Sequence, residues 1–152
     1  TGRPLKEGKW FSKFTSNYLD IDNDPLYPFG YGLSYTTFKY GKPTLSSNTM
    51  TNNETISVSV DITNTGNYDA DEIAQMYIRD LAASVSRPVK ELKGFERISI
   101  KKGETKTVTF TITPEDLKFY NQELEYKNEP GEFEVMVGPN SKDVQTLTFT
   151  LK

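Results

Sequence analysis

Apolar and polar residues alternate one by one in several stretches of this chain. The clearest apolar rows are Ile56-Val58-Val60-Ile62, Ala74-Met76-Ile78, Ile98-Ile100, Val108-Phe110-Ile112, Phe133-Val135-Val137 and Leu147-Phe149-Leu151. A period of two puts alternate residues on opposite faces of a strand, so each row predicts a half-buried antiparallel strand. Met136 falls on the polar side of its row. Phe95 is out of phase with Ile98 and Ile100, which predicts a bulge or bend there.

Turn-forming residues separate these rows. They occur in Asn64-Thr65-Gly66-Asn67, Lys102-Gly103, Pro130-Gly131 and Gly138-Pro139-Asn140. One helical turn is expected at Thr113-Pro114-Glu115-Asp116, where Thr113 can cap and Asp116 closes a capping box. The chain also holds 18 Thr against four Ala, which favours strands over helices. We therefore expect an all-β fold, a two-sheet β-sandwich of the immunoglobulin or fibronectin type III kind with about seven or eight strands.

Residues 1–34 differ from the rest of the chain, because they contain several Pro and Gly residues and no clear period. Ten of the 19 aromatic residues lie within the first 40 positions, whereas a disordered linker is poor in aromatics. We expect an irregular arm over 1–34 and a sandwich domain over 35–152. The arm packs either on its own sandwich or on a neighbouring domain.

Composition and charge exclude several classes of function. The chain has no His and no Cys, which excludes Ser-His-Asp triads, Cys-His dyads, disulfides and His- or thiolate-bound metals. The net charge of −3 argues against nucleic acid as a partner. The longest apolar run is three residues, so no membrane-spanning helix is expected. Because residue 1 is Thr, we expect a processed product or an excised piece.

Two acidic clusters are candidates for binding sites. The stretch Asp20-Ile21-Asp22-Asn23-Asp24 is similar to a calcium loop, but Pro25 and Tyr31 replace the Gly and Glu that the EF-hand pattern requires. This difference favours an acidic turn rather than a metal site. The second cluster, Asp69, Asp71 and Glu72, lies where a strand begins and is interpreted as a solvated face.

The other candidate motifs are weak. Paired carboxylates can hydrolyse glycosides, but with 21 acidic residues any such pair carries no specificity. Gly30-Tyr31-Gly32 is only a fragment of a glycine-rich loop. Asn53-Glu54-Thr55 is a glycosylation sequon. A basic stretch is interrupted by two acids and is interpreted as a solvated loop; its members are Arg87, Lys90, Lys93 and Arg97. We therefore assign no catalytic, cofactor-binding or metal residue.

Several longer segments together resemble one known family. They include Asp24-Pro25-Leu26-Tyr27-Pro28-Phe29-Gly30-Tyr31-Gly32-Leu33-Ser34-Tyr35-Thr36-Thr37-Phe38, Gln75-Met76-Tyr77-Ile78-Arg79-Asp80, Ser86-Arg87-Pro88-Val89-Lys90-Glu91-Leu92-Lys93-Gly94-Phe95 and Glu129-Pro130-Gly131-Glu132-Phe133. In order and spacing they resemble the C-terminal fibronectin type III-like domain of glycoside hydrolase family 3. The resemblance covers nearly the whole chain. Lys118-Phe119-Tyr120-Asn121-Gln122 is most similar to the bacterial periplasmic β-glucosidases of that family.

The resemblance implies an accessory domain without catalytic residues. In this family the aspartate nucleophile lies on a (β/α)8 barrel, and the acid/base comes largely from a second, α/β sandwich domain. Both precede the segments found here, and Thr1-Gly2-Arg3-Pro4 resembles the stretch that follows the α/β domain. The expected partners are these two domains of the same polypeptide, with no cofactor, nucleic acid or membrane.

The expected parent is a β-glucosidase that removes terminal β-D-glucosyl residues from oligosaccharides in the bacterial periplasm or outside the cell. The chain would stabilise the parent's catalytic domains. The alternative is a carbohydrate-binding module in which exposed aromatics such as Trp10 and Tyr18 stack on sugar rings. A free-standing enzyme is disfavoured, because the chain lacks His, Cys and a nucleotide-binding loop.

Overall fold

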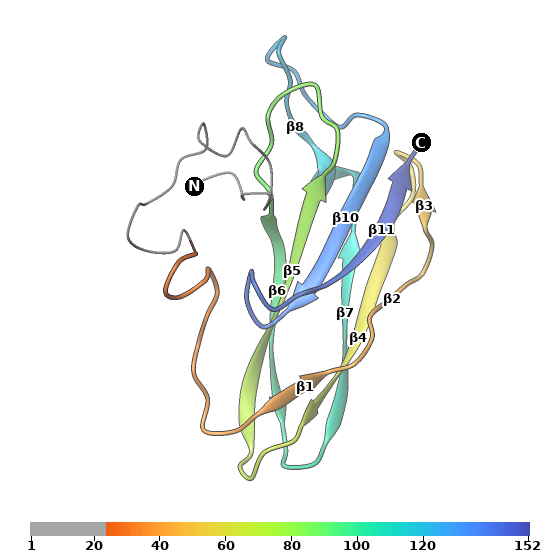
Figure 1. Ribbon diagram of the computed structural model, residues 1–152. Helices are drawn as coiled ribbons and strands as arrows, with labels where there is room; N and C mark the ends of the chain where they lie inside the picture. The colour runs from red at the N-terminus through yellow and green to blue at the C-terminus, as the bar shows by residue number, and fades with distance from the viewer. Residues whose placement is uncertain (1–23) are drawn as a thin grey trace, which may run out of the picture.

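The computed structural model describes residues 24–152 (Figure 1). Its elements are β1 (Phe38–Tyr40), β2 (Thr44–Leu45), β3 (Thr49–Met50), β4 (Ile56–Asn64), β5 (Ala70–Asp80), β6 (Glu91–Ile100), β7 (Thr105–Ile112), a 3₁₀ turn η2 (Pro114–Leu117), β8 (Phe119–Tyr120), β9 (Tyr126–Lys127), β10 (Gly131–Gly138) and β11 (Gln145–Leu151).

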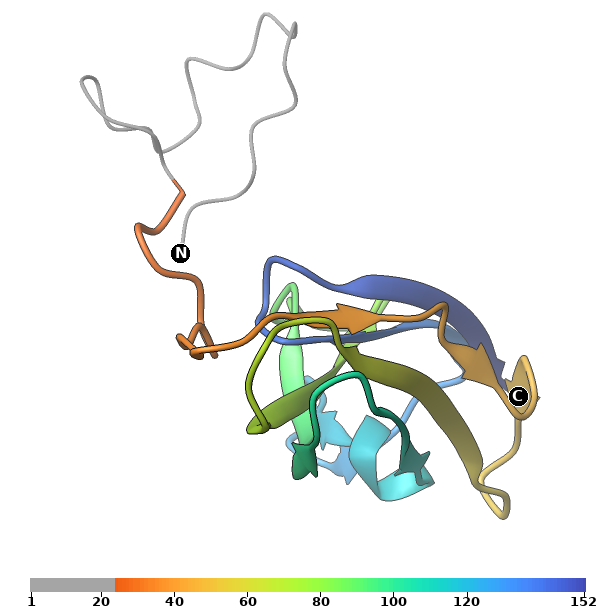
Figure 2. The same cartoon turned by 90° about the horizontal axis from the view of Figure 1, so that it is seen from below.

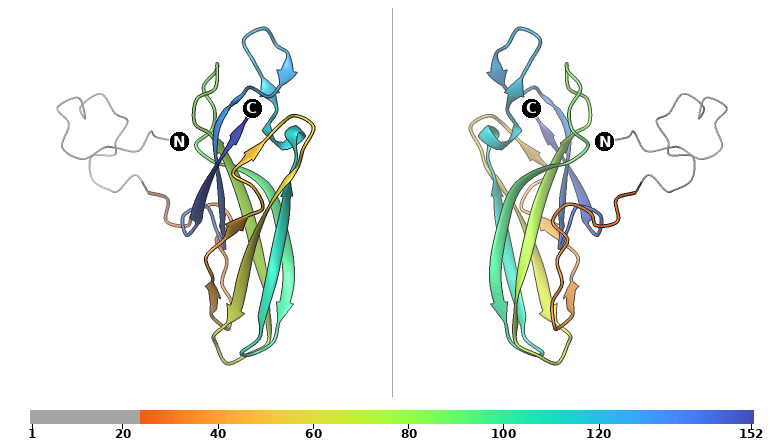
Figure 3. Two further views of the ribbon diagram at one scale, coloured as in Figure 1. Left: turned by 90° about the vertical axis from the view of Figure 1, so that its right-hand side faces the viewer. Right: turned by 90° about the vertical axis from the view of Figure 1, so that its left-hand side faces the viewer.

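The long strands form two sheets that pack face to face, as Figure 3 shows from the side. In the four-stranded sheet, β4 pairs with β7 and with the short strands β1 and β2. The five-stranded sheet has the order β3-β11-β10-β5-β6, and β3 runs parallel to β11. The short strands β8 and β9 form a separate hairpin. The expected two-sheet all-β sandwich is confirmed. The described residues form eleven strands rather than the expected seven or eight, because several of them are short strands of two or three residues.

The apolar rows found in the sequence form the core between the sheets. Ile62 and Ile112 are fully buried in the four-stranded sheet, and Ala74, Val135 and Phe149 are buried in the five-stranded sheet. The rings of Phe133 and Phe149 stack 5.5 Å apart between their centroids across β10 and β11. A period of two therefore predicted the inward face of every long strand correctly.

The outer face of the five-stranded sheet departs from that pattern. Met136 is buried although it lies on the polar side of its row, and so are Gln75 and Tyr77 on the outer face of β5. The assignment of Met136 to an exposed face was therefore wrong. For Gln75 and Tyr77 the cause is tertiary: the segment that leads into β1 contacts both, through the carbonyl oxygen of Gly30 and through the ring of Phe29, which meets the ring of Tyr77 edge-on at 6.5 Å.

The bulge predicted near Phe95 is present in β6. The pairing of β5 with β6 shifts register between Met76 and Tyr77, opposite Gly94 and Leu92. Gly94 faces the core, where a Cβ atom would lie 3.2 Å from the ring of Phe110. Phe95 consequently points outward and is 69% exposed.

The predicted helical turn and hairpin turns are also present. In η2, the Asp116 carboxylate accepts hydrogen bonds from the backbone N–H and the hydroxyl of Thr113, both at 2.7 Å. Gly103 adopts a φ of +75° in the turn between β6 and β7, a conformation that glycine adopts without strain. Local turn chemistry thus determined these chain reversals.

Residues 24–35 form a lead-in segment that approaches the sandwich at one edge and then runs into β1 (Figure 2). Residues 1–23 of the expected arm lie outside the described residues, so the boundary at residue 34 stays a prediction. Within the lead-in segment, Phe29 and Gly30 contact Tyr77 and Gln75 of β5.

Phe110 provides a test of this core. It is 8% exposed between the sheets, so Phe110→Ala should lower the free energy of unfolding by about 3–5 kcal/mol through lost burial and a cavity. Phe95→Ala, at an exposed position on β6, should lower the free energy of unfolding by less than about 1 kcal/mol. Urea denaturation measures both values. Equal losses for the two variants would contradict the assignment of Phe110 to the core.

Candidate interdomain docking surface

Exposed apolar side chains lie on the outer face of the five-stranded sheet and on the lead-in segment next to it. We define this outer apolar patch as Tyr31, Leu33, Tyr35, Ile73 and Phe95, all of which have large exposed fractions. Leu33 and Tyr35 are 89% and 95% exposed. Ile73 and Phe95 stand on neighbouring strands at positions where a solvated sheet face carries polar residues. Clustered exposed apolar side chains of this kind mark interaction surfaces.

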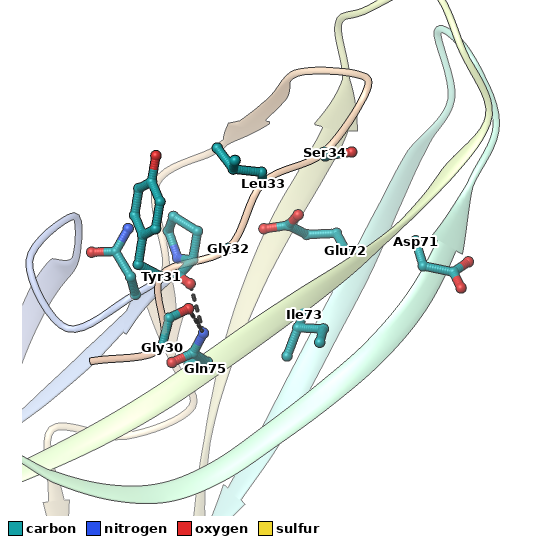
Figure 4. A pocket seen from close by; sticks show the side chains of 11 residues that line it. Gly30, Tyr31, Gly32, Leu33, Ser34, Asp71, Glu72, Ile73 and Gln75 are labelled. Atoms are coloured by element: carbon teal, nitrogen blue, oxygen red, sulfur yellow. Dashed lines mark hydrogen bonds between the residues drawn. The ribbon is translucent and has the colours of Figure 1, made fainter. Parts of the chain in front are cut away.

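The lead-in segment and the sheet form a shallow cavity of about 240 Å³ beside this patch. Tyr31 and Leu33 line it on one side, and Glu72, Ile73 and Gln75 line it on the side of β5 (Figure 4). In Figure 4, Glu72 points toward the lead-in segment whereas Asp71 points away from it. The patch is therefore built jointly by two parts of the chain that are some 40 residues apart in sequence.

Hydrogen bonds fasten the lead-in segment to the sheet. The side-chain amide of Gln75 donates to the carbonyl oxygen of Gly30 at 3.0 Å and to that of Pro139 at 2.6 Å (Figure 4). The backbone N–H of Ser141 donates to the carbonyl oxygen of Phe29 at 2.9 Å. An ion pair at 2.9 Å joins Lys142 to Asp24 at the start of the described chain. These contacts hold residues 28–31 against the turn between β10 and β11.

A half-buried tyrosine–carboxylate pair lies beneath the same region. The Tyr40 hydroxyl on β1 donates to Glu72 Oε1 on β5 at 2.8 Å and so links the two sheets. Burial raises the pKa of Glu72, although the hydrogen bond from Tyr40 acts in the opposite direction. Burial and the neighbouring carboxylate raise the pKa of Tyr40, so its hydroxyl remains a donor. Glu72 is thus an ionisable group held in a half-buried site.

The second acidic cluster does not come together as one site. Asp71 accepts hydrogen bonds from Ser99 and Arg97, which lower its pKa. Asp69 accepts from the backbone N–H of Lys102 at 2.7 Å. Together with the Glu72–Tyr40 bond, these contacts give each acid a separate partner. A solvated face describes Asp69 and Asp71, but Glu72 is half-buried rather than solvated.

The basic stretch is likewise divided among several contacts. Arg87 pairs with Glu91, and its guanidinium lies 4.6 Å from the centroid of the Phe119 ring. Lys93 pairs with Glu91 at 3.0 Å, and Lys90 donates to the carbonyl oxygen of Ser141. Arg87, Lys90 and Lys93 are therefore structural rather than members of a freely solvated loop, which corrects the expectation for these three residues. Arg97, paired with Asp71, is 72% exposed in its side chain.

Other candidates fall outside the described part or stay apart. Asp20 and Asp22 of the calcium-like stretch, and Trp10 and Tyr18 of the sugar-binding alternative, lie outside residues 24–152. Within that range no three acidic side chains gather as metal ligands. Asn53 of the sequon is exposed in the loop before β4. The described helical residues include no segment long and apolar enough to cross a membrane.

The sequence did not identify Gln75 or Tyr77 as site residues, and it assigned Glu72 to a solvated face. Gln75 and Tyr77 share a face of β5 with charged residues, so an alternating pattern assigns them to solvent. One signal was available, because Gln75 and Tyr77 both lie in a segment that resembles the family. Nothing in the sequence indicates that Gly30 returns to lie on Gln75, since the two are 45 residues apart.

The strand order and sheet pairing define a sandwich of the fibronectin type III class. A comparison with protein families agrees, since it matches residues 72–141 to the fibronectin type III-like domain. Among curated proteins, the chain is 52% identical over 151 residues to the periplasmic β-glucosidase of Salmonella typhimurium. The aligned region covers 99% of this chain and 20% of that enzyme. It is 52% identical over 137 residues to a β-xylosidase of Formosa agariphila, covering 89% of this chain and 19% of that enzyme.

A solved structure gives the same result. The β-glucosidase from Listeria innocua in complex with isofagomine superposes with a TM-score of 0.89 and 43% identity, over 99% of this chain and 21% of that enzyme. The chain thus spans about a fifth of the length of the relatives it matches. Residues 72–141 thus match the fibronectin type III-like domain, and nearly the whole chain is similar to one part of these longer enzymes.

The Tyr40–Glu72 pair predicts a pH-dependent stability. Tyr40→Phe leaves the half-buried Glu72 without its donor, and hydrogen bonds to charged groups contribute about 1.5–3 kcal/mol. We expect a loss near the lower end of this range at pH 7, because the pair is only half-buried, and a smaller loss at pH 4, where Glu72 is more protonated. Urea denaturation at the two pH values measures the difference.

The half-buried Glu72 also makes the stability of the folded chain depend on pH. Because its pKa is raised in the folded state, the stability that Glu72 contributes is complete below its unfolded pKa and is lost as the pH rises through the folded pKa. Glu72→Gln retains an acceptor for Tyr40 and removes this titration. The variant should therefore gain stability relative to the parent protein between pH 4 and pH 7. A constant difference across that range would contradict the burial of Glu72.

Proposed function

We propose that this chain is an accessory domain of a family 3 β-glucosidase, without catalytic residues of its own. It docks through the outer apolar patch on the catalytic domains of the same polypeptide and stabilises them. The parent enzyme hydrolyses terminal β-D-glucosyl residues of oligosaccharides. The observation that carries this proposal is the exposure of Ile73 and Phe95 beside the lead-in segment, through which the chain connects to whatever precedes it.

Burial of this patch would supply the energy for docking. Contact between domains of one chain typically removes about 600–1,500 Å² from solvent, and each Å² of apolar surface contributes about 25 cal/mol. Phe95 and Leu33 are large side chains that are mostly exposed in the described domain. Because the domains share one polypeptide, docking is intramolecular. Even a modest apolar contact therefore keeps most molecules in the docked state.

The proposed partners are a (β/α)8 barrel and an α/β sandwich domain. Support comes from the coverage of the relatives, in which this chain corresponds to a minor part of a longer enzyme. The aspartate nucleophile and the acid/base would belong to these partners. We also propose a periplasmic or secreted location, which is supported by the name of the Salmonella typhimurium relative.

The chain alone should not hydrolyse glucosides. The resemblance assigns the nucleophile and the acid/base to other domains, and the carboxylates around the cavity are engaged by Tyr40, Arg97 and Ser99. Purified chain incubated with nitrophenyl β-glucoside should release nitrophenol at the rate of buffer. Release above that rate, by protein free of contaminating enzyme, would overturn the assignment.

Docking through the patch predicts an effect that appears only in the longer enzyme. Phe95→Thr removes the ring but keeps a residue that favours strands. The free energy of unfolding of the isolated chain should therefore change by less than about 1 kcal/mol. In the enzyme with its catalytic domains, the same change should accelerate thermal inactivation of β-glucosidase activity several-fold.

Tyr120→Thr is the matched control, because Tyr120 is an exposed strand aromatic of similar exposure (64%) on the β8–β9 hairpin, away from the patch. Its inactivation rate should equal that of the parent enzyme. If Phe95→Thr and Tyr120→Thr behave alike in the enzyme, the outer apolar patch is not the docking surface.

A further inference from the structure

Gln75 is a buried polar residue on the outer face of a sheet, outside the sandwich core. It is only 5% exposed, and a buried amide must find hydrogen-bond partners to avoid a large penalty. Its nitrogen donates to the carbonyl oxygens of Gly30 and Pro139, and its oxygen accepts from the hydroxyl of Tyr77. Both donor positions of the amide are thereby used, by two loops that are far apart in sequence.

Gly30 fits this arrangement for two independent reasons. Its φ is +79°, which disfavours any residue with a side chain. A Cβ atom at this position would also lie 2.0 Å from Oε1 of Gln75, which is not sterically possible without a shift. The close approach of the lead-in backbone to Gln75 therefore depends on glycine at position 30.

The preceding residue, Phe29, is also held in place. The carbonyl oxygen of Phe29 accepts from the N–H of Ser141, and the carbonyl oxygen of Ser141 accepts from Lys90. The Phe29 ring rests edge-on against Tyr77, whose hydroxyl already binds Gln75. The lead-in segment is thus fixed at two consecutive residues, immediately before Tyr31 and Leu33 of the outer apolar patch.

We infer that Gln75 is a positioning residue for interdomain docking: it locks the lead-in segment onto β5, so that Tyr31 and Leu33 form one rigid surface with Ile73 and Phe95. The partner is the apolar surface of the preceding catalytic domain, and in this respect the inference rests on the proposed function. Because the clamp lies outside the core, loss of its hydrogen bonds releases the segment rather than opening the sandwich. Preorganised segments bind more tightly because less conformational entropy is lost on docking.

Amide hydrogen exchange on the 152-residue chain tests the clamp itself. In Gln75→Leu, the N–H of Ser141, which bonds to Phe29, should exchange about tenfold faster, since each hydrogen bond contributes roughly a factor of five to ten. The exchange rates of core amides in β4 and β7 should change no more than they do in the matched control Gln145→Leu. Gln145 on β11 also donates its amide to a loop carbonyl, that of Gly41 at 2.7 Å, which follows β1 and is not part of the lead-in segment. Unchanged exchange at Ser141 would overturn the clamp.

A double-mutant cycle separates the clamp from a general loss of packing. Gly30→Ala should accelerate exchange at Ser141 strongly in the parent chain, because its methyl group collides with Gln75. In the Gln75→Ala background that collision is gone and only the backbone strain remains, so the same change should have a smaller effect. Equal effects in the two backgrounds would overturn direct contact between Gly30 and Gln75.

The docking role is tested in the longer enzyme. Gln75→Leu should accelerate thermal inactivation of β-glucosidase activity several-fold, whereas Gln145→Leu should not. If Ser141 exchange rises in the chain and Phe95→Thr weakens the enzyme, but Gln75→Leu does not, the positioning role is wrong and the proposed docking surface stands. If neither Phe95→Thr nor Gln75→Leu weakens the enzyme, the proposed function itself fails.

Discussion

Strand β5 carries the constraint on which the rest of this domain depends, because both of its faces are buried over the same stretch. Ala74, Met76 and Ile78 fill the core, while Gln75 and Tyr77 hold the lead-in segment on the opposite face. A strand covered on both sides cannot shift register without exposing apolar residues on one face and breaking hydrogen bonds on the other. The inner packing of the sandwich and the path of the incoming chain are therefore determined by the same residues.

This double use of β5 explains where the apolar surface is exposed. The lead-in segment contacts the outer sheet face at Gln75 and Tyr77, and it leaves Ile73 and Phe95 exposed. Phe95 pairs with Gln75 and so lies on the outer face of β6, next to the bulge. An isolated domain has no reason to keep such side chains in water, whereas a domain within a longer polypeptide can bury them against its neighbour. The coverage of relatives, about a fifth of each enzyme, is consistent with this use.

The charged residues have a different role from the one that their clustering indicates. Acidic and basic groups that are close in sequence are divided among separate partners, as with Asp71 and Arg97 on neighbouring strands or Arg87 and Glu91 around the β5–β6 connection. An exposed pair such as Asp71 and Arg97 contributes little to stability. Glu72 differs, because its burial beside Tyr40 makes the link between the two sheets sensitive to protonation. Electrostatics therefore adjusts this fold locally, while apolar burial determines it.

The sequence by itself determined the sandwich class, the inward face of each long strand, the bulge near Phe95 and the capped turn at Thr113, because these features depend on residues that are neighbours along the chain or along one strand. It also indicated the family, through segments whose order and spacing are specific. Only the tertiary structure decided that Met136, Gln75 and Tyr77 are buried, that Glu72 meets Tyr40, and that Gly30 lies on Gln75. Gln75 and Tyr77 lie on a face that local alternation assigns to water, and Glu72 and Gly30 meet partners that are distant in sequence. No local pattern records which distant segment will make these contacts.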